Sequence, residues 1–293
     1  MTKDELRHLK DQPIGVFDSR LGGLTVVHEL MGAMAGEDII YLGDSARAPY
    51  GPKSQETVRR FAMEAAGFLL QFKPKMLVVA CNTASAAAID VLKRSSPVPV
   101  VDVVIPGAAA ALAKTAGIIG VVGTSGTIRS GAYERAIHAI DPSREVVSAA
   151  CPLLVPIVEE GRADNDVIVV AALSDYLRDL QQARAKAVIL GCTHYPLLQA
   201  AFKKILGPDV ALVSSSTAAA KEVQKQLSML GMQSSRIYGG RLKCFTTDNA
   251  EDFRRLGERF GGRQINETNE VGTERLESMR LVEGSGSQEA SVK

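Results

Sequence analysis

Two cysteines stand at equivalent places after apolar, strand-like runs. Cys81 follows Met76–Ala80, Cys192 follows Ala187–Gly191, and a threonine comes within two residues of each thiol. In open α/β sheets the carboxyl ends of the strands bind ligands, because loops and helix N-termini there present free N–H groups. Two thiols placed in this way could face one ligand from opposite sides, an arrangement that suits the inversion of a carbon centre.

A thiol in such a site can act as a base or as an acid. Its ordinary pKa of about 8.5 is lowered by a helix N-terminus or a nearby cation. Cys81 precedes Asn82–Ala88, which predicts a helix start whose dipole favours the thiolate. Cys192 stands two residues before His194, which could orient or protonate the thiol. These features suit removal of a proton from the carbon next to a carboxylate, a step that needs a positioned base.

A zinc site is the alternative use of Cys81, Cys192 and His194. Structural zinc sites have four ligands with an orienting shell of further groups, so a distant carboxylate such as Asp18 or Glu159 would have to complete the set. The spacing of these residues along the chain does not favour that alternative. A structural role is also open for His194 and Asp18, since an Asp before Ser at a strand end commonly caps the next helix.

The composition is typical of a globular protein that neither enters membranes nor binds nucleic acid. Of 293 residues, 46% are apolar and 23% charged, and the formal net charge is +1. No run is apolar and long enough to span a bilayer, and Met1–His8 is charged without an apolar signal core. We therefore expect a cytoplasmic protein with reduced thiols, in which Cys151 and Cys244 are small buried hydrophobes.

Apolar runs such as Pro13–Phe17 and Ile118–Val122 alternate with amphipathic segments such as Ser54–Phe72. This alternation predicts an α/β fold with doubly wound, mainly parallel sheets. Gly-rich turns at 18–23 and 123–127 follow strands where helices begin, so their N–H groups could hold a carboxylate or a phosphate. Neither turn matches a phosphate-cradling loop or a complete dinucleotide fingerprint, so no nucleotide cofactor is predicted.

Six ordered segments carry a resemblance to a known family. They are Ile14–Ser19, Tyr41–Gly51, Ala80–Ala86, Gly120–Thr124, Cys151–Pro156 and Leu190–Pro196. On these segments the chain resembles the cofactor-independent glutamate racemases of bacteria, over nearly all of residues 14–261. The resemblance implies a reaction in which one of Cys81 and Cys192 removes the α-proton as thiolate and the other delivers a proton to the opposite face. It implies no metal and no other cofactor.

The resemblance also implies roles for other residues. Asp18 and His194 would assist Cys81 and Cys192 respectively, and Glu159 would be a further catalytic carboxylate, although the neighbouring Glu160 could take that place. Groups that would contact the substrate are Asp18, Ser19, Tyr50, Gly51, Asn82, Thr83, Thr124, Thr193 and His194. From the residues alone, ordinary turn and helix-cap roles are open for each of them.

Two residues depart from the family pattern. Arg20 stands where the family usually has glycine, which would alter the charge or the conformation of the substrate loop, and Ile105 replaces a glutamate before Pro106-Gly107. The implied fold is two pseudo-symmetric α/β lobes that face a central cleft. We expect lobe one at residues 1–104 plus 214–262, lobe two at 105–213, and a flexible C-terminal tail at 263–293.

The function implied by the resemblance is conversion of L-glutamate to D-glutamate for peptidoglycan biosynthesis. A racemase acting on aspartate or another acidic amino acid is the enzymatic alternative, and a catalytically idle binding protein of the same fold is the other. The expected partner is the small-molecule substrate, glutamate, without membrane or direct nucleic-acid contact. A homodimer and a contact with DNA gyrase are expectations by family analogy alone.

Overall fold

The computed structural model describes residues 9–262 and 264–283. Its strands are Ile14–Asp18 (β1), Ile39–Gly43 (β2), Met76–Val79 (β3), Val100–Asp102 (β4), Ile119–Gly123 (β5), Val146–Ala150 (β6), Ala187–Gly191 (β7), Ala211–Ser214 (β8), Leu242–Thr246 (β9) and Glu267–Glu270 (β10). Its α-helices are Leu24–Ala33 (α2), Gln55–Leu70 (α3), Asn82–Ser95 (α4), Val104–Leu112 (α5), Ser125–Ser130 (α6), Ala132–His138 (α7), Leu154–Glu159 (α8), Val167–Tyr176 (α9), Arg178–Gln182 (α10), Gln199–Leu206 (α11), Ser215–Met229 (α12), Ala250–Gly261 (α13) and Thr273–Ser278 (α14). Short 3₁₀ turns lie at Ser45–Arg47 (η1) and Tyr195–Leu198 (η2).

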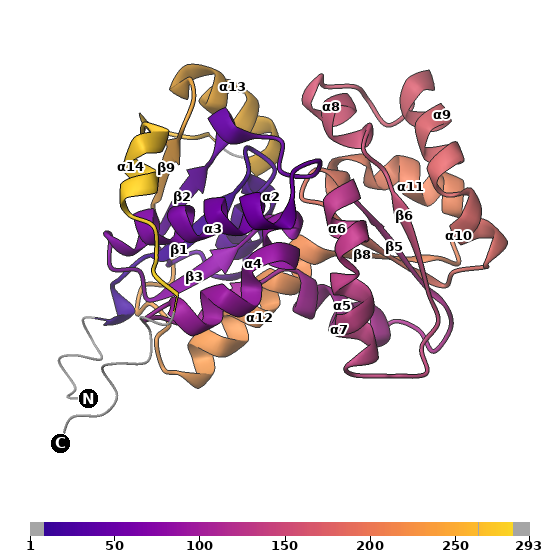
Figure 1. The fold of residues 1–293 in the computed structure, drawn as a ribbon, viewed down its shortest axis with the longest axis horizontal. Coiled ribbons are helices and arrows are strands. Elements are labelled where there is room, and N and C mark those ends of the chain that lie inside the picture. Colours follow the sequence, from indigo (N-terminus) through magenta and orange to yellow (C-terminus); the bar gives the residue numbers. More distant parts are fainter. Residues whose placement is uncertain (1–8, 263, 284–293) are drawn as a thin grey trace.

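The strands form two parallel sheets (Figure 1). One has six strands in the order β10-β9-β2-β1-β3-β4 and carries α2–α4 and α12–α14, and we call it the larger lobe. The other has four strands in the order β6-β5-β7-β8 and carries α5–α11, and we call it the smaller lobe. All paired strands run parallel, which confirms the predicted fold class.

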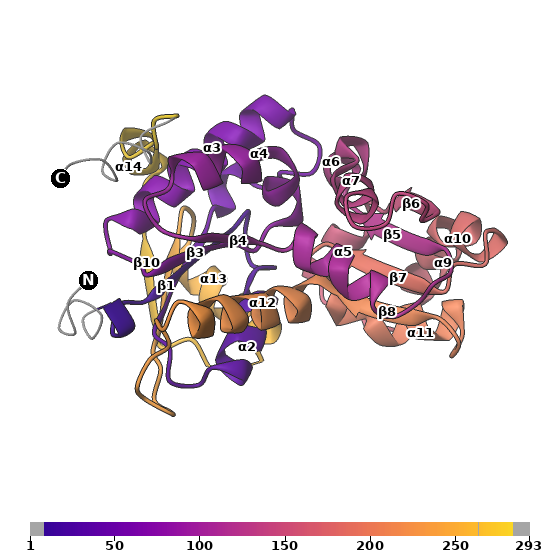
Figure 2. The same cartoon turned by 90° about the horizontal axis from the view of Figure 1, so that it is seen from below.

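Successive residues of each central strand pack into different cores, because helices cover both faces of each sheet. In β3, Val78 packs in the core that contains α2 and α12, whereas Leu77 and Val79 pack in the core of α3 and α4. Figure 2 shows these two pairs of helices on opposite faces of the sheet. In β7, Ile189 likewise faces α5 and α7, whereas Leu190 faces α9 and α11. Burial on both faces is the reason that these strands read as unbroken apolar runs.

The chain returns to the larger lobe through α12, which packs against α2 of that lobe and α5 of the smaller one. This helix therefore sets how the two sheets stand relative to each other. We propose that the chain crosses between the lobes near residues 104 and 214, as in the predicted division. That division would place Cys81 and Cys192 in different lobes.

The prediction of a flexible tail at 263–293 is wrong for residues 267–278. β10 pairs in parallel with β9 at the sheet edge, and α14 packs on α3. The strand was missed because its sequence, Glu-Thr-Asn-Glu, is polar and lies mostly exposed, as an edge strand can. Residue 263 and residues 284–293 lie outside the described part of the chain, as do residues 1–8.

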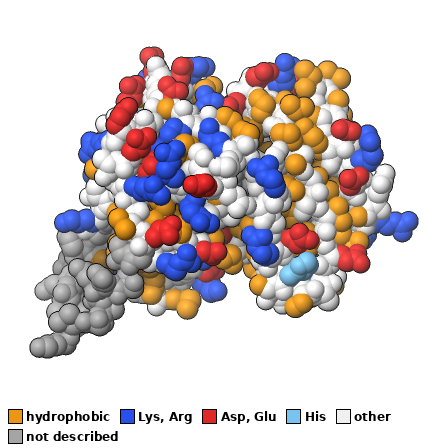
Figure 3. Space-filling model, in the orientation of Figure 1, with side chains coloured by type: hydrophobic (Ala, Val, Ile, Leu, Met, Phe, Trp, Pro, Cys, Tyr) orange, Lys and Arg blue, Asp and Glu red, His pale blue; other side chains and the backbone are white. Residues whose placement is uncertain are grey.

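Charges are mixed on the molecular face of Figure 3, where basic and acidic side chains are interspersed over both lobes. Hydrophobic side chains gather on the smaller lobe near α8 and α9, and Leu153, Val167 and Ile168 are exposed there. Within residues 9–262 and 264–283, no helix is long and apolar enough to cross a membrane.

Gly67 is the contact point between α3 and the C-terminal segment, and its replacement by alanine is expected to loosen that segment. A Cβ atom at Gly67 would lie 1.8 Å from the carbonyl oxygen of Met279. We expect Gly67→Ala to lower the free energy of unfolding by about 1–3 kcal/mol, as overpacking does. Urea unfolding and hydrogen exchange of residues 267–281 would measure this. Gly32→Ala in α2, where a Cβ meets nothing within 4 Å, is the matched control and should be neutral or stabilising.

Candidate active site

Cys81 lies where β3 ends and α4 begins. Its Sγ accepts a hydrogen bond from the Ala84 N–H at 3.4 Å, as the cap of that helix, and lies 3.8 Å from Ser19 Oγ. Ser19 follows β1, which pairs directly with β3 in the sheet. The parallel pairing thus brings Asp18, Ser19 and Cys81 to one edge of the larger lobe.

Asp18 is buried at this edge with half of its carboxylate unpaired. Its Oδ2 accepts hydrogen bonds from the N–H groups of Gly23 at 3.0 Å and Arg20 at 3.2 Å. Its Oδ1 is buried and has no hydrogen-bond partner among the described residues. Burial raises the pKa of Asp18, although the charge of His194 and the backbone N–H groups act in the opposite direction. A cationic group of a ligand would complete the coordination of this carboxylate.

Cys192 ends the equivalent strand of the smaller lobe and has its own polar neighbours. His194 Nδ1 lies 3.9 Å from Cys192 Sγ, and His194 Nε2 lies 3.2 Å from Glu159 Oε1. Of the two adjacent glutamates it is therefore Glu159 that faces this cluster, whereas Glu160 is exposed and pairs with Arg162. Cys192, His194 and Glu159 form a continuous polar chain.

Contacts between the lobes join these two clusters. Thr83 Oγ1 lies 2.9 Å from Thr124 Oγ1, and the Tyr133 hydroxyl donates to Asn82 Oδ1 at 2.6 Å. The loop after β1 touches the loop after β7, because a Cβ atom at Gly22 would lie only 2.2 Å from Thr193 Oγ1. The carboxyl edges of the two sheets therefore face each other at close range.

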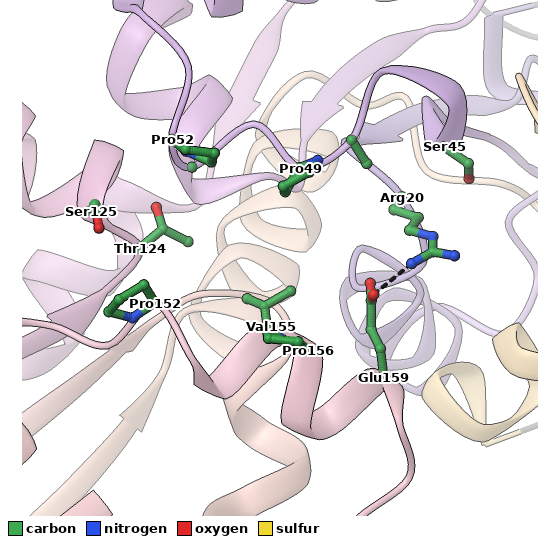
Figure 4. Close-up of a pocket in the computed structure, with 12 residues that line it drawn as sticks. Arg20, Ser45, Pro49, Pro52, Thr124, Ser125, Pro152, Val155, Pro156 and Glu159 are labelled. Carbon is green, nitrogen blue, oxygen red and sulfur yellow. Dashed lines mark hydrogen bonds and ion pairs between the residues drawn. The ribbon is translucent and has the colours of Figure 1, made fainter. Parts of the chain in front are cut away.

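A cavity of about 580 Å³ opens between the lobes beside these clusters (Figure 4). It is lined by Arg20, Ser45, Ala48, Pro49, Gly51, Pro52, Thr124, Ser125, Pro152, Val155, Pro156 and Glu159. Neither cysteine is among the lining residues, and each is nearly buried, with 5% of Cys81 and 6% of Cys192 exposed. The cavity reaches the clusters through Thr124, which contacts Thr83, and through Glu159, which contacts His194.

Burial sets the protonation of both thiols in this closed arrangement. It raises the pKa of Cys81 to about 12. The charge of Asp18 acts in the same direction, and hydrogen bonds from Ala84 and Ser19 act in the opposite one. Burial also raises the pKa of Cys192, and the charges of Asp18 and Cys81 act in the same direction. Both groups are thus protonated thiols at neutral pH. Within residues 9–262 and 264–283, no cluster of His, Cys, Asp and Glu side chains has the geometry to hold a metal ion.

Tyr50 does not present its side chain to the cavity. The ring is buried, and its hydroxyl donates to Asp44, which also accepts from the Arg47 guanidinium and from the Thr247 hydroxyl. This buried polar network holds the segment that carries Gly51 against the cavity. Sequence analysis quoted the segment as a motif but missed the positioning role of Asp44 and Arg47.

Comparison with known proteins bears on this geometry. The family model described as Asp/Glu/Hydantoin racemase matches residues 24–223.

The chain belongs to the Asp/Glu/Hydantoin racemase family.

Among its relatives in this racemase family, the glutamate racemase of Geobacter metallireducens is 46% identical over 262 residues, which cover 89% of this chain and 97% of the relative. The crystal structure of a glutamate racemase isoform of Bacillus anthracis matches with a TM-score of 0.86 at 42% identity, covering 89% of this chain and 98% of that one. The structure of Francisella tularensis glutamate racemase in complex with D-glutamate matches with a TM-score of 0.85 at 37% identity, covering 92% and 99%.

The structure of this racemase-family chain brings most of the predicted site residues to the facing sheet edges. The two residues that depart from the family pattern lie in different surroundings. Arg20 reaches across the cavity to Glu159, whereas Ile105 lies in α5 with 45% of its surface exposed. Sequence analysis missed Tyr133 and also Phe260, whose ring packs edge-on against His194 at 5.1 Å between centroids. No local pattern marks Phe260, because it is 66 positions away along the chain.

The buried thiols predict a loss of stability at alkaline pH. Burial raises the pKa of Cys244 to about 12, whereas an unfolded cysteine titrates near about 8.5. Below that unfolded value both states hold the proton. Between the two values only the unfolded state loses it, so stability falls by about 1.4 kcal/mol per pH unit for each such thiol. Urea unfolding between pH 8 and about 10.5 would measure the slope.

The matched variant is Cys244→Ala, which removes one titrating thiol outside the site. We expect it to unfold more easily at neutral pH and to show a shallower pH slope, by about 1 kcal/mol per unit. Equal slopes for the variant and the parent would contradict the assignment of this alkaline loss to buried thiols.

Proposed function

We propose that this racemase-family protein interconverts L- and D-glutamate by proton transfer through Cys81 and Cys192. The observation that carries the proposal is the facing pair of half-sites: each sheet presents one buried thiol at a strand end, with Asp18 beside the first and the chain of His194 and Glu159 beside the second. The relatives named above are glutamate racemases, and one of them was crystallised with D-glutamate. These relationships favour glutamate as substrate.

In the proposed reaction one cysteine, as thiolate, forms a bond to the α-proton while the electron pair of the C–H bond stays on carbon. The other cysteine, as thiol, then gives its proton to the opposite face of that carbon, and the enzyme is left with the two protonation states exchanged. The reverse reaction uses the same groups in opposite order. Each round is balanced in protons and electrons, and requires no group beyond the chain's own side chains.

Binding would prepare the thiolate. The ammonium group of the substrate suits the unpaired Oδ1 of buried Asp18, and a positive charge between the thiols would lower the pKa that burial has raised. One thiol proton must leave on binding, so that one thiolate and one thiol face the α-carbon. His194, which touches both Cys192 and Glu159, is placed to accept that proton when it leaves Cys192.

The remaining predicted contacts would orient the substrate. Ser19, Asn82, Thr83 and Thr193 would hold its amino and α-carboxylate groups, whereas the Tyr50-Gly51 backbone and Thr124 would meet the side-chain carboxylate. In support, Gly51 and Thr124 are both among the residues that line the cavity. A cytoplasmic location and supply of D-glutamate for peptidoglycan belong to the same proposal, and the homodimer and the gyrase contact stay predictions.

The test is circular dichroism of L-glutamate incubated with the purified, reduced protein, with D-glutamate and L-aspartate in parallel. Loss of signal from both glutamate enantiomers, with aspartate unchanged, is the expected result. Loss with aspartate would assign the other acidic amino acid as substrate. No change with any of the three would leave a binding protein of this fold and overturn the proposed activity.

A further inference from the structure

We propose that Arg20 is a positioning residue, which holds the Glu159 carboxylate from across the cavity and so sets the contact that Glu159 makes with His194. The inference rests on the proposed function and extends it to a residue outside the predicted site. Arg20 belongs to the loop after β1 in the larger lobe, and Glu159 ends α8 in the smaller lobe. Figure 4 shows the two side chains meeting over the cavity.

The two oxygens of Glu159 are shared between two partners from different lobes. Oε2 pairs with Arg20 Nη1 at 2.5 Å, and Oε1 lies 3.2 Å from His194 Nε2. Among the residues that line the cavity, Arg20 and Glu159 are the two charged ones. The orientation of the carboxylate toward His194 therefore depends on a charge that the larger lobe supplies.

Two hydrogen bonds within the larger lobe fix the backbone of Arg20. Its N–H donates to Asp18 Oδ2 at 3.2 Å, and its carbonyl oxygen accepts from the Tyr41 hydroxyl at 2.8 Å. The side chain thus starts from the loop that carries Asp18 and ends at the carboxylate that contacts His194. Arg20 links the polar assistants of the two cysteines, which no other described ion pair does.

The charges around Glu159 favour its ionised form. Burial acts to raise the pKa of Glu159, but hydrogen bonding and charge from His194 and then from Arg20 outweigh it, and the pKa lies below its ordinary value. Other groups facing this point are Arg259 of α13, which lies against Gly161, and Phe260, which covers His194. An ionised Glu159 accepts from His194, whereas a protonated one competes with His194 as a donor.

Loss of Arg20 is expected to lower kcat/KM at acidic pH more than at neutral pH. Activity that needs ionised Glu159 is lost as pH falls through its pKa, and removal of a neighbouring cation raises that pKa, so the loss begins at higher pH. We expect Arg20→Gln to lower kcat/KM about two- to fivefold near about pH 4.5 and less at about pH 8, the scale of a partly exposed ion pair. Arg20→Lys, which keeps the positive charge, should retain most of the kcat/KM of the parent at acidic pH.

The experiment measures kcat/KM for glutamate against pH in the parent, Arg20→Gln, Arg20→Lys and Glu159→Gln, with the double variant of Arg20→Gln and Glu159→Gln. If Arg20 acts through Glu159, the double variant shows no further loss beyond Glu159→Gln and no pH shift of its own. Arg178→Gln is the matched control, because Arg178 is exposed in α10 and forms an exposed ion pair with Asp175 of α9 at 2.8 Å. Additive losses, or a Lys variant as poor as the Gln variant, would overturn the proposal.

A second readout separates this inference from the proposed activity. Urea unfolding of the parent, Arg20→Gln, Glu159→Gln and the double variant forms a double-mutant cycle, which reports the coupling of Arg20 with Glu159 without any substrate. A parent that leaves glutamate unchanged would sink the proposed function. A coupling free energy of zero between Arg20 and Glu159 in unfolding, together with an unshifted pH profile of kcat/KM, would overturn the positioning role of Arg20 and leave the proposed function intact.

Discussion

Cys81→Ser and Cys192→Ser are each expected to slow racemisation of glutamate by about 100- to 10,000-fold, the usual contribution of a positioned acid or base. A serine hydroxyl is far less acidic than a thiol, so it cannot replace the thiolate that removes the α-proton. Each thiol serves one face of the substrate, and loss of either therefore blocks both directions of the reaction. Circular dichroism of L- and D-glutamate, followed separately, measures the loss.

A second measurement distinguishes the two-thiol mechanism from a general collapse of the site. In each variant the remaining cysteine can still remove the α-proton of one enantiomer and return a solvent proton to the same face. In heavy water we therefore expect deuterium to enter one enantiomer in Cys81→Ser and the opposite enantiomer in Cys192→Ser. Incorporation into both enantiomers by either variant would contradict a division of labour between the thiols.

Cys151→Ser is the matched control for these variants. Cys151 is buried in the smaller lobe and donates toward the carbonyl oxygen of Ala149 at 3.6 Å, so its replacement tests the cost of a buried serine without touching either half-site. We expect it to retain most of the activity. Full activity in Cys81→Ser or Cys192→Ser would falsify the assignment of the catalytic pair.

Gly22→Ala is expected to reduce kcat/KM for glutamate about 100-fold with the fold intact. A Cβ atom at Gly22 would lie 2.2 Å from Thr193 Oγ1 and 2.5 Å from His194 Nδ1, so the loop after β1 must move away from the loop after Cys192. A displacement of about 1 Å between catalytic groups can cost about 10²-fold in rate. The added methyl group acts on the distance between the half-sites and not on their chemistry.

The measurement pairs steady-state kinetics with thermal unfolding of the same samples. Gly32→Ala serves as the control, since it adds the same methyl group to α2 at an open position. Unchanged kinetics in Gly22→Ala would mean that the close approach of the two loops is not needed for the reaction. A large drop in melting temperature instead of activity would locate the role of Gly22 in folding.

Much of the fold follows from the sequence, because a buried parallel strand needs apolar side chains on both of its faces. The apolar runs that precede Cys81 and Cys192 are of this kind, and they correctly predicted β3, β7 and the position of each thiol at a strand end. The same rule failed for β10, whose polar residues form an exposed edge strand. This strand is stabilised by its pairing with β9 and not by an apolar run of its own. The helix α13 was also not predicted, although its apolar residues Phe253 and Phe260 lie on one buried face.

The site shows the same division between local and long-range determinants. Sequence alone determined which residues stand at the strand ends, among them Asp18, Cys81 and Cys192, because the end of an apolar run is a local feature. The tertiary structure alone decided that Glu159 and not Glu160 faces His194, and that Arg20 reaches Glu159 from a position 139 residues away. Contacts of this second kind depend on how α12 and the facing loops set one lobe against the other. That placement results from packing summed over the whole interface between the lobes, which no short segment of sequence encodes.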